Sequence, residues 1–81
     1  MRIRVHVTPR VGVLDPQGKA VAGGLKSLGF DEVGEVRVGK VIDVTVDGLT
    51  EEQALDRGRA MAAKLLANEV VEDFDVHVFA D

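Results

Sequence analysis

The chain has 81 residues, no cysteine and a net charge of −4. This length predicts a single domain, residues 1–81, whose small core and lack of disulfides favour stabilisation by oligomerisation. The acidic charge argues against a nucleic-acid or anionic-membrane surface. A strand-like pattern begins directly after Met1 and no apolar run is long enough to span a membrane, so we expect a cytoplasmic protein without a signal peptide.

The first expected element is a strand over residues 2–8. Apolar and polar residues alternate strictly in this stretch, which predicts a half-buried strand. Pro9 should end it, because proline cannot donate a ladder hydrogen bond. His6 lies on the polar face, and no second ligand follows at a useful spacing. We therefore expect His6 to have no catalytic or metal-binding role.

A helix is expected from Pro16 to Leu28. Asp15 is a typical N-cap residue before a proline at the first helical position, and Gly29 suits the left-handed position after a helix. This helix should cover the sheet with one apolar face. The residues expected on that face are Val21, Leu25 and Leu28.

Gly18 falls at the third position of this helix, where glycine costs about 1 kcal/mol relative to alanine. Nothing in the neighbouring sequence requires a missing side chain there. The exposed helix entrance formed with Gln17 is therefore either a plain cap or a surface that a partner approaches closely. On this reasoning, Gly18→Ala should leave folding intact or improve it slightly.

Residues 33–47 allow two interpretations. A hairpin turn at Gly39 and Lys40 would give a four-stranded β-α-β-β-α-β domain of the ferredoxin-like kind. We favour one long strand, bent or bulged at Gly39, because the period of two continues across the glycine. A strand of that length would extend beyond an 81-residue core and would need a neighbouring subunit.

The second helix should begin at a capping box, Thr50 to Gln53, and end at Asn68 as a left-handed terminator. The last strand should run from about Asp73 to Phe79. The outward faces of the two terminal strands are basic and acidic, so they would match as antiparallel neighbours. The residues expected in the buried stripe of the second helix are Ala54, Leu55, Met61, Ala62, Leu65 and Leu66.

Together these elements predict an α+β fold, a two-layer sandwich with an antiparallel sheet and two helices on one face. The order is β-α-β(-β)-α-β with a long bent central strand, related to the ferredoxin-like fold and dimerising. No nucleophile can be paired with a histidine, and Gly39-Lys40 lacks the Ser or Thr of a phosphate loop. The carboxylates of residues 69–75 are expected to form a solvated rim. We therefore expect no catalytic, cofactor-binding or metal-binding residue in this chain.

Three stretches carry a family resemblance: Gly12-Val-Leu-Asp-Pro-Gln-Gly-Lys-Ala-Val21, Val36-Arg-Val-Gly-Lys40, and Leu65-Leu-Ala-Asn68 followed by Val70, Val71, Glu72 and Phe74. With this spacing the chain resembles the PurS family, the small subunit of phosphoribosylformylglycinamidine synthase. One departure is Glu69, where the family often has proline. This difference is expected to loosen the exit from the second helix.

The resemblance implies a non-catalytic subunit that bridges a glutaminase subunit and an ATP-dependent synthetase subunit. It would support ammonia transfer in de novo purine biosynthesis, as a homodimer or tetramer. The complex would use ATP and magnesium, with neither bound by this chain. The alternative is a stand-alone ACT-like regulatory module that binds a small molecule. The candidate partner-interface residues are Asp15, Pro16, Gln17, Gly18, Arg37, Gly39, Lys40 and Asn68.

Overall fold

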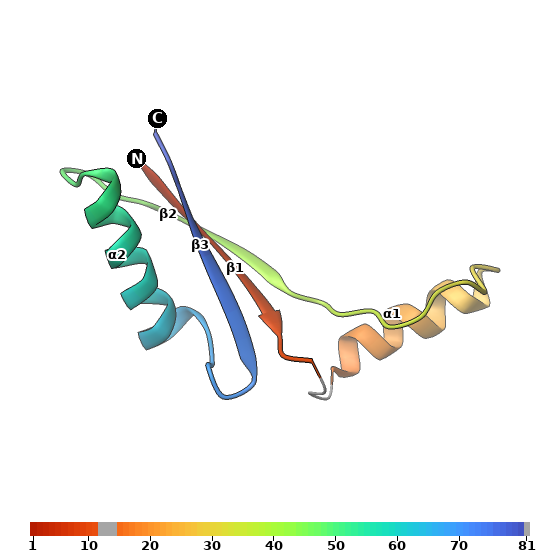
Figure 1. The fold of residues 1–81 in the computed structure, drawn as a ribbon. Helices are drawn as coiled ribbons and strands as arrows, with labels where there is room; N and C mark the ends of the chain where they lie inside the picture. Colours follow the sequence, from red (N-terminus) through yellow and green to blue (C-terminus); the bar gives the residue numbers. More distant parts are fainter. Residues whose placement is uncertain (12–14, 81) are drawn as a thin grey trace.

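The structure is a computed structural model that describes residues 1–11 and 15–80. In chain order the elements are β1 (Arg2–Pro9), α1 (Pro16–Ser27), β2 (Lys40–Thr45), α2 (Glu51–Met61), the π-helical turn η1 (Ala62–Leu66) and β3 (Glu72–Phe79). The three strands form one antiparallel sheet in the order β2-β1-β3. The predicted α+β class is confirmed, and the start of β1 lies beside the end of β3, since Arg2 is paired with Phe79 (Figure 1).

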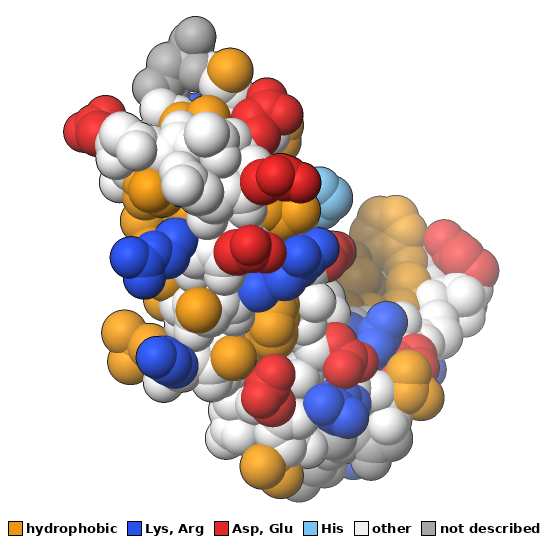
Figure 2. All heavy atoms as spheres, turned by 60° about the vertical axis from the view of Figure 1, so that its left-hand side comes forward, with side chains coloured by type: hydrophobic (Ala, Val, Ile, Leu, Met, Phe, Trp, Pro, Cys, Tyr) orange, Lys and Arg blue, Asp and Glu red, His pale blue; other side chains and the backbone are white. Residues whose placement is uncertain are grey.

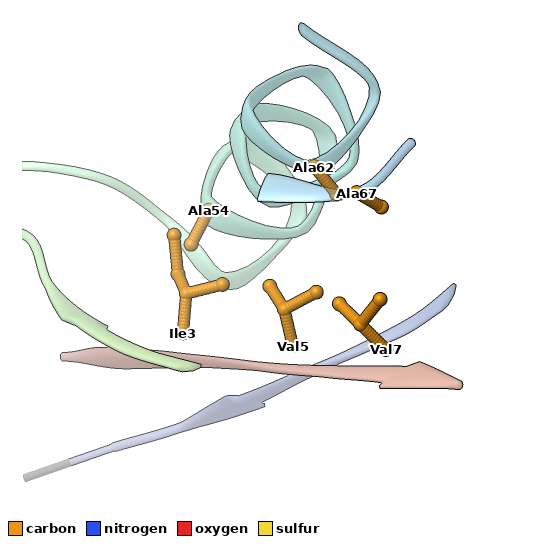
Figure 3. Packing of buried hydrophobic residues seen from close by; sticks show 6 residues of the cluster. All are labelled: Ile3, Val5, Val7, Ala54, Ala62 and Ala67. Carbon is orange, nitrogen blue, oxygen red and sulfur yellow. The ribbon is translucent and has the colours of Figure 1, made fainter. Parts of the chain in front are cut away.

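The core lies between the sheet and α2. On the central strand β1, the inward side chains Ile3, Val5 and Val7 are fully buried. They point toward the alanines that line the helical side of the core (Figure 3). Gly58 lets the helix approach closely, because a Cβ built there would lie 2.7 Å from both Ile3 Cγ2 and Val76 Cγ1. The terminal strands and the core they form agree with the alternating pattern of the sequence.

Local capping motifs form as predicted at the start of α2 and at the end of α1. The Thr50 hydroxyl accepts from the Gln53 N–H at 3.2 Å, while the Gln53 side chain accepts from the Thr50 N–H at 3.0 Å, which completes the capping box. At the end of α1, Gly29 has φ +100°. The N–H of Phe30 then donates to the carbonyl of Leu25 at 3.0 Å, which is the long bond of a Schellman motif.

Helix α1 does not cover the sheet of its own chain, so the prediction of two helices on one face is wrong for α1. It lies to the side of the sheet, away from α2 (Figure 1). Its predicted inward residues Val21 and Leu28 are 44% and 76% exposed. The Cα radius of gyration is 16.0 Å, whereas a compact chain of this length would have about 12 Å. The amphipathic pattern of α1 therefore marks a face that its own chain leaves open.

Residues 33–39 form neither the long strand nor the hairpin that the sequence suggested. Strand β2 begins only at Lys40 and ends at Thr45, at the edge of the sheet rather than its centre. The preceding segment runs back alongside α1 (Figure 1). An alternating pattern is typical of extended backbone, whether or not that backbone is hydrogen-bonded to another strand. The pattern therefore overestimated the length of the strand.

The end of the second helix also differs from the prediction. The last turn is π-helical, and Ala67 leaves it in an extended conformation with φ −127°. Asn68 is not left-handed, since no described residue other than glycine has a positive φ. Its side chain instead accepts from the N–H of Val70 at 3.2 Å, as in an Asx turn. Leu65 is 84% exposed, so its place in the buried stripe was predicted wrongly.

Candidate functional site

The predicted interface residues, apart from Asn68, come together at one place. They lie where the end of β1, the start of α1 and the approach to β2 meet, and we call this place the α1 junction. Its members are Asp15, Pro16, Gln17, Gly18, Arg37, Gly39 and Lys40. Asn68 lies apart, in the turn that leads to β3. Gly12, Val13 and Leu14, which belong to the first of the similar stretches, lie outside the described residues.

Asp15 joins two segments at this junction. One carboxylate oxygen accepts from the N–H of Gly18 at 2.9 Å and caps α1, and the other accepts from the N–H of Val38 at 2.9 Å. The hydrogen bond from Gly18, followed by that from Val38, lowers the pKa of the Asp15 carboxyl, because both stabilise the charged form. A single side chain therefore starts α1 and holds the segment before β2 against it.

Gly18 is buried by its own chain, which corrects our interpretation of that glycine. A Cβ there would collide with the carbonyl oxygen of Val36 and lie 2.7 Å from Asp15 Oδ2. Gly39 has a similar role, because its Cβ would lie 2.5 Å from the carbonyl oxygen of Val7. The missing side chains thus allow backbone segments to pack, and we now expect Gly18→Ala to disturb the junction.

The outer surface of the junction is polar and accessible. Arg37 donates through Nη1 to the carbonyl oxygen of Pro9 at 3.0 Å. Pro16, Gln17 and Lys40 are exposed. Because Gly39 packs on β1 and Lys40 is the first residue of β2, this pair forms a strand entrance rather than a phosphate-binding loop. Among its described residues, the junction has polar groups held by hydrogen bonds and no nucleophile paired to a base.

The uncovered face of the sheet holds a second polar group that sequence reasoning missed. Arg4 binds both carboxylate oxygens of Asp43, at 2.8 and 3.1 Å, and its hydrogen bond lowers the pKa of the Asp43 carboxyl. Beside this pair, His6 lies opposite Asp75, and His77 is two residues farther along β3 on the same face. An antiparallel alignment of the two terminal strands in the sequence would have predicted that His6, Asp75 and His77 are neighbours.

The fold and the junction define a small α+β protein in which one helix, α1, does not pack on the sheet of its own chain. Residues 2–80 match the PurS family model, phosphoribosylformylglycinamidine (FGAM) synthase. The chain is 43% identical over 77 residues to the PurS subunit of Synechocystis sp., covering 95% of this chain and 77% of that protein. It is 40% identical over 78 residues to the PurS subunit of Bacillus subtilis, covering 95% and 90%.

Solved structures agree. The crystal structure of B. subtilis PurS superposes with a TM-score of 0.83 at 37% identity, over 98% of each chain. A chain of PurLQS from Thermotoga maritima superposes with a TM-score of 0.82 at 29% identity, over 94% of this chain and 93% of that one. The chain belongs to the PurS family, the small subunit of FGAM synthase, a ligase of purine biosynthesis. Within the described residues, no helix is long and apolar enough to cross a membrane.

Proposed function

We propose that this chain is the non-catalytic subunit that bridges the glutaminase and synthetase subunits of FGAM synthase and supports ammonia transfer between them. The observation that carries the proposal is the likeness to a chain of PurLQS from T. maritima over nearly the full length of both chains. That protein's name joins PurS with PurL and PurQ. We propose the same partners here, with ATP and magnesium bound by the synthetase subunit.

A bridging role is consistent with the chemistry of the described surface. A hollow of about 570 Å³ between α2 and β3 is lined by Arg59, Ala63, Phe74, Asp75 and Val76. This lining contains no hydroxyl nucleophile beside a histidine, as acyl transfer would require. The α1 junction instead presents exposed polar groups on a backbone held by hydrogen bonds, which suits recognition by another protein.

Reconstitution tests this role. Purified chain is added to the glutaminase and synthetase subunits, and glutamine-dependent FGAM formation is measured beside complex formation on a sizing column. We expect both to require the chain. Gln17→Ala should weaken assembly, because an exposed amide that can donate and accept is lost, whereas Ser27→Ala at the far end of α1 should not. Equal FGAM formation with and without the chain would contradict the proposal.

We further propose that the chain forms a homodimer in which α1 of each copy packs on the sheet of the other. Gly18 is the only described residue of α1 that its own chain buries. Exposed hydrophobic side chains lie among charged ones over the surface (Figure 2). At the same time α2 packs on β1 and β3 but not closely on β2, so the inward residues Ile42 and Val44 are only partly buried. Each copy therefore has an open apolar helix face and an open stretch of sheet.

Sedimentation equilibrium at micromolar concentration tests the dimer. Val21→Lys should shift the population toward the 8.7 kDa monomer, because burying an aliphatic side chain is worth about 1.5–3 kcal/mol and a lysine there would lose it. Gly23→Lys is the matched control on the opposite face of α1, where a Cβ would meet nothing within 4 Å. A monomer throughout the dilution series would rule out the dimer, and equal effects of the two lysines would rule out this arrangement.

A further inference from the structure

The outward face of the sheet holds the chain's two histidines beside a carboxylate. His6 lies in the middle of β1, directly opposite Asp75 of β3, and His77 follows on the same face. One potential ligand atom from each of the three residues lies within 4.8 Å of the other two. These side chains come from sequence positions about 70 apart, which is why no spacing rule indicated them.

We infer that His6, Asp75 and His77 form a binding site for a divalent transition-metal ion of the zinc class. Two imidazoles and one carboxylate are the donor set of open, three-ligand zinc sites, in which the fourth position holds water or an incoming group. In a tetrahedral site with bonds of zinc length, ligand atoms lie about 3.4 Å apart. His77 Nε2 and Asp75 Oδ1 are already 3.6 Å apart, which is close to this spacing.

The orientation of the two rings is compatible with this set. The imidazoles of His6 and His77 have centroids 5.3 Å apart and planes inclined by 72°. Edge-on rings of this kind can direct one nitrogen each toward a shared point, whereas stacked rings cannot. The side chains of His77 and Asp75 are 51% and 64% exposed, so an ion from solution can reach them.

The backbone under the three ligands is fixed. His6 lies between Val5 and Val7, whose side chains are fully buried on the other face. β3 is paired with β1 along its whole length, from Glu72 to Phe79. A site of this kind gains affinity when its ligands are held on rigid elements, because less freedom is lost on binding.

Arg4, a cation beside the cluster, is paired with the carboxylate of Asp43. Arg4 lies opposite His77, and an unpaired guanidinium there would repel a metal ion. It is bound by both oxygens of Asp43 on β2 and lies 5.1 Å from the ring of Phe79. Asp43 thus offsets the positive charge that would oppose the ion, and Arg4 pairs with Asp43 rather than with Asp75.

The inference is tested on the whole purified chain without an affinity tag, by titrating it with Zn²⁺ in a calorimeter. We expect saturable binding of one ion per chain. His6→Gln, His77→Gln and Asp75→Asn should each weaken binding at least about 10–100-fold, since even the loss of an outer-shell partner commonly has that effect. The three substituted positions are on the surface, and circular dichroism with an unchanged melting profile in the absence of metal would verify that each variant folds.

Asp73→Asn is the matched control. Asp73 shares the strand and face of Asp75, carries the same charge and is paired with Arg10 outside the cluster. Its loss should leave Zn²⁺ affinity within about twofold. Unsaturable binding, equal weakening by Asp73→Asn and Asp75→Asn, or binding that survives removal of either histidine would overturn the site. The titration involves no other subunit, so its outcome is independent of the bridging role.

Discussion

Gly18→Ala is the substitution whose outcome the structure changes most. The added methyl group meets the carbonyl oxygen of Val36 and the carboxylate of Asp15, and neither can move without disturbing the hydrogen bond that Asp15 accepts from Val38. Overpacking of this kind costs typically about 1–3 kcal/mol. The gain in helix propensity offsets about 0.4–1 kcal/mol of it. The net effect is a loosening of the α1 junction by about 1–2 kcal/mol.

Because α1 makes little contact with the core, this loss should appear as local opening rather than global unfolding. The assay is native-state amide hydrogen exchange at Val38, whose N–H donates to Asp15. Its exchange should accelerate by about 5–30-fold, the factor that corresponds to 1–2 kcal/mol. Gly23→Ala is the control, since a Cβ there meets open space. Unchanged or slower exchange in Gly18→Ala would refute the argument.

Three further predictions follow from contacts elsewhere in the chain. Gly58→Ala should destabilise the chain by about 1–3 kcal/mol in urea unfolding, because its methyl group would press on Ile3 and Val76. Thr50→Ala should cost about 1 kcal/mol in the same assay by removing the N-cap of α2. A lowered pKa means that Asp15 stabilises the junction above its ordinary range near pH 4 and loses this effect as pH falls through the folded value. The protection factors of its N–H donors, which are corrected for the intrinsic pH dependence of exchange, should therefore fall at low pH. This fall should be absent in Asp15→Ala.

The sequence was most informative where structure is decided by neighbouring residues. Caps at Asp15, Thr50 and Gly29 depend on a side chain or a left-handed backbone within a few positions, and all three formed as predicted. Alternation likewise located β1 and β3, because one face of β1 is buried and one face of β3 is partly buried in the same chain. These features need no knowledge of what lies across the fold.

Prediction failed where the deciding contact is distant in the sequence. The sequence pattern identified the apolar face of α1. The pattern does not specify what that face packs against. Neighbouring residues do not explain the glycine at position 18. The contact that requires it is with the carbonyl oxygen of Val36, on a separate segment. His6 seemed isolated because its neighbours Asp75 and His77 are at the other end of the chain. Most of the predicted interface residues thus lie together at the α1 junction, where Gly18 and Gly39 allow backbone segments of the chain itself to pack. Their contact with a partner stays a prediction.

The contacts at the α1 junction explain how a helix without a core can keep a defined direction. Hydrogen bonds from Val38 to Asp15 and from Arg37 to Pro9 join α1 and the following segment to the end of β1. These bonds use backbone groups and leave the apolar side chains of α1 unengaged. In the dimer that we propose, the orientation of α1 would already be fixed in each monomer. Less orientational freedom would therefore be lost on association. In that dimer the small residues of the junction would matter to assembly, because they let the backbone hold α1 away from its own sheet.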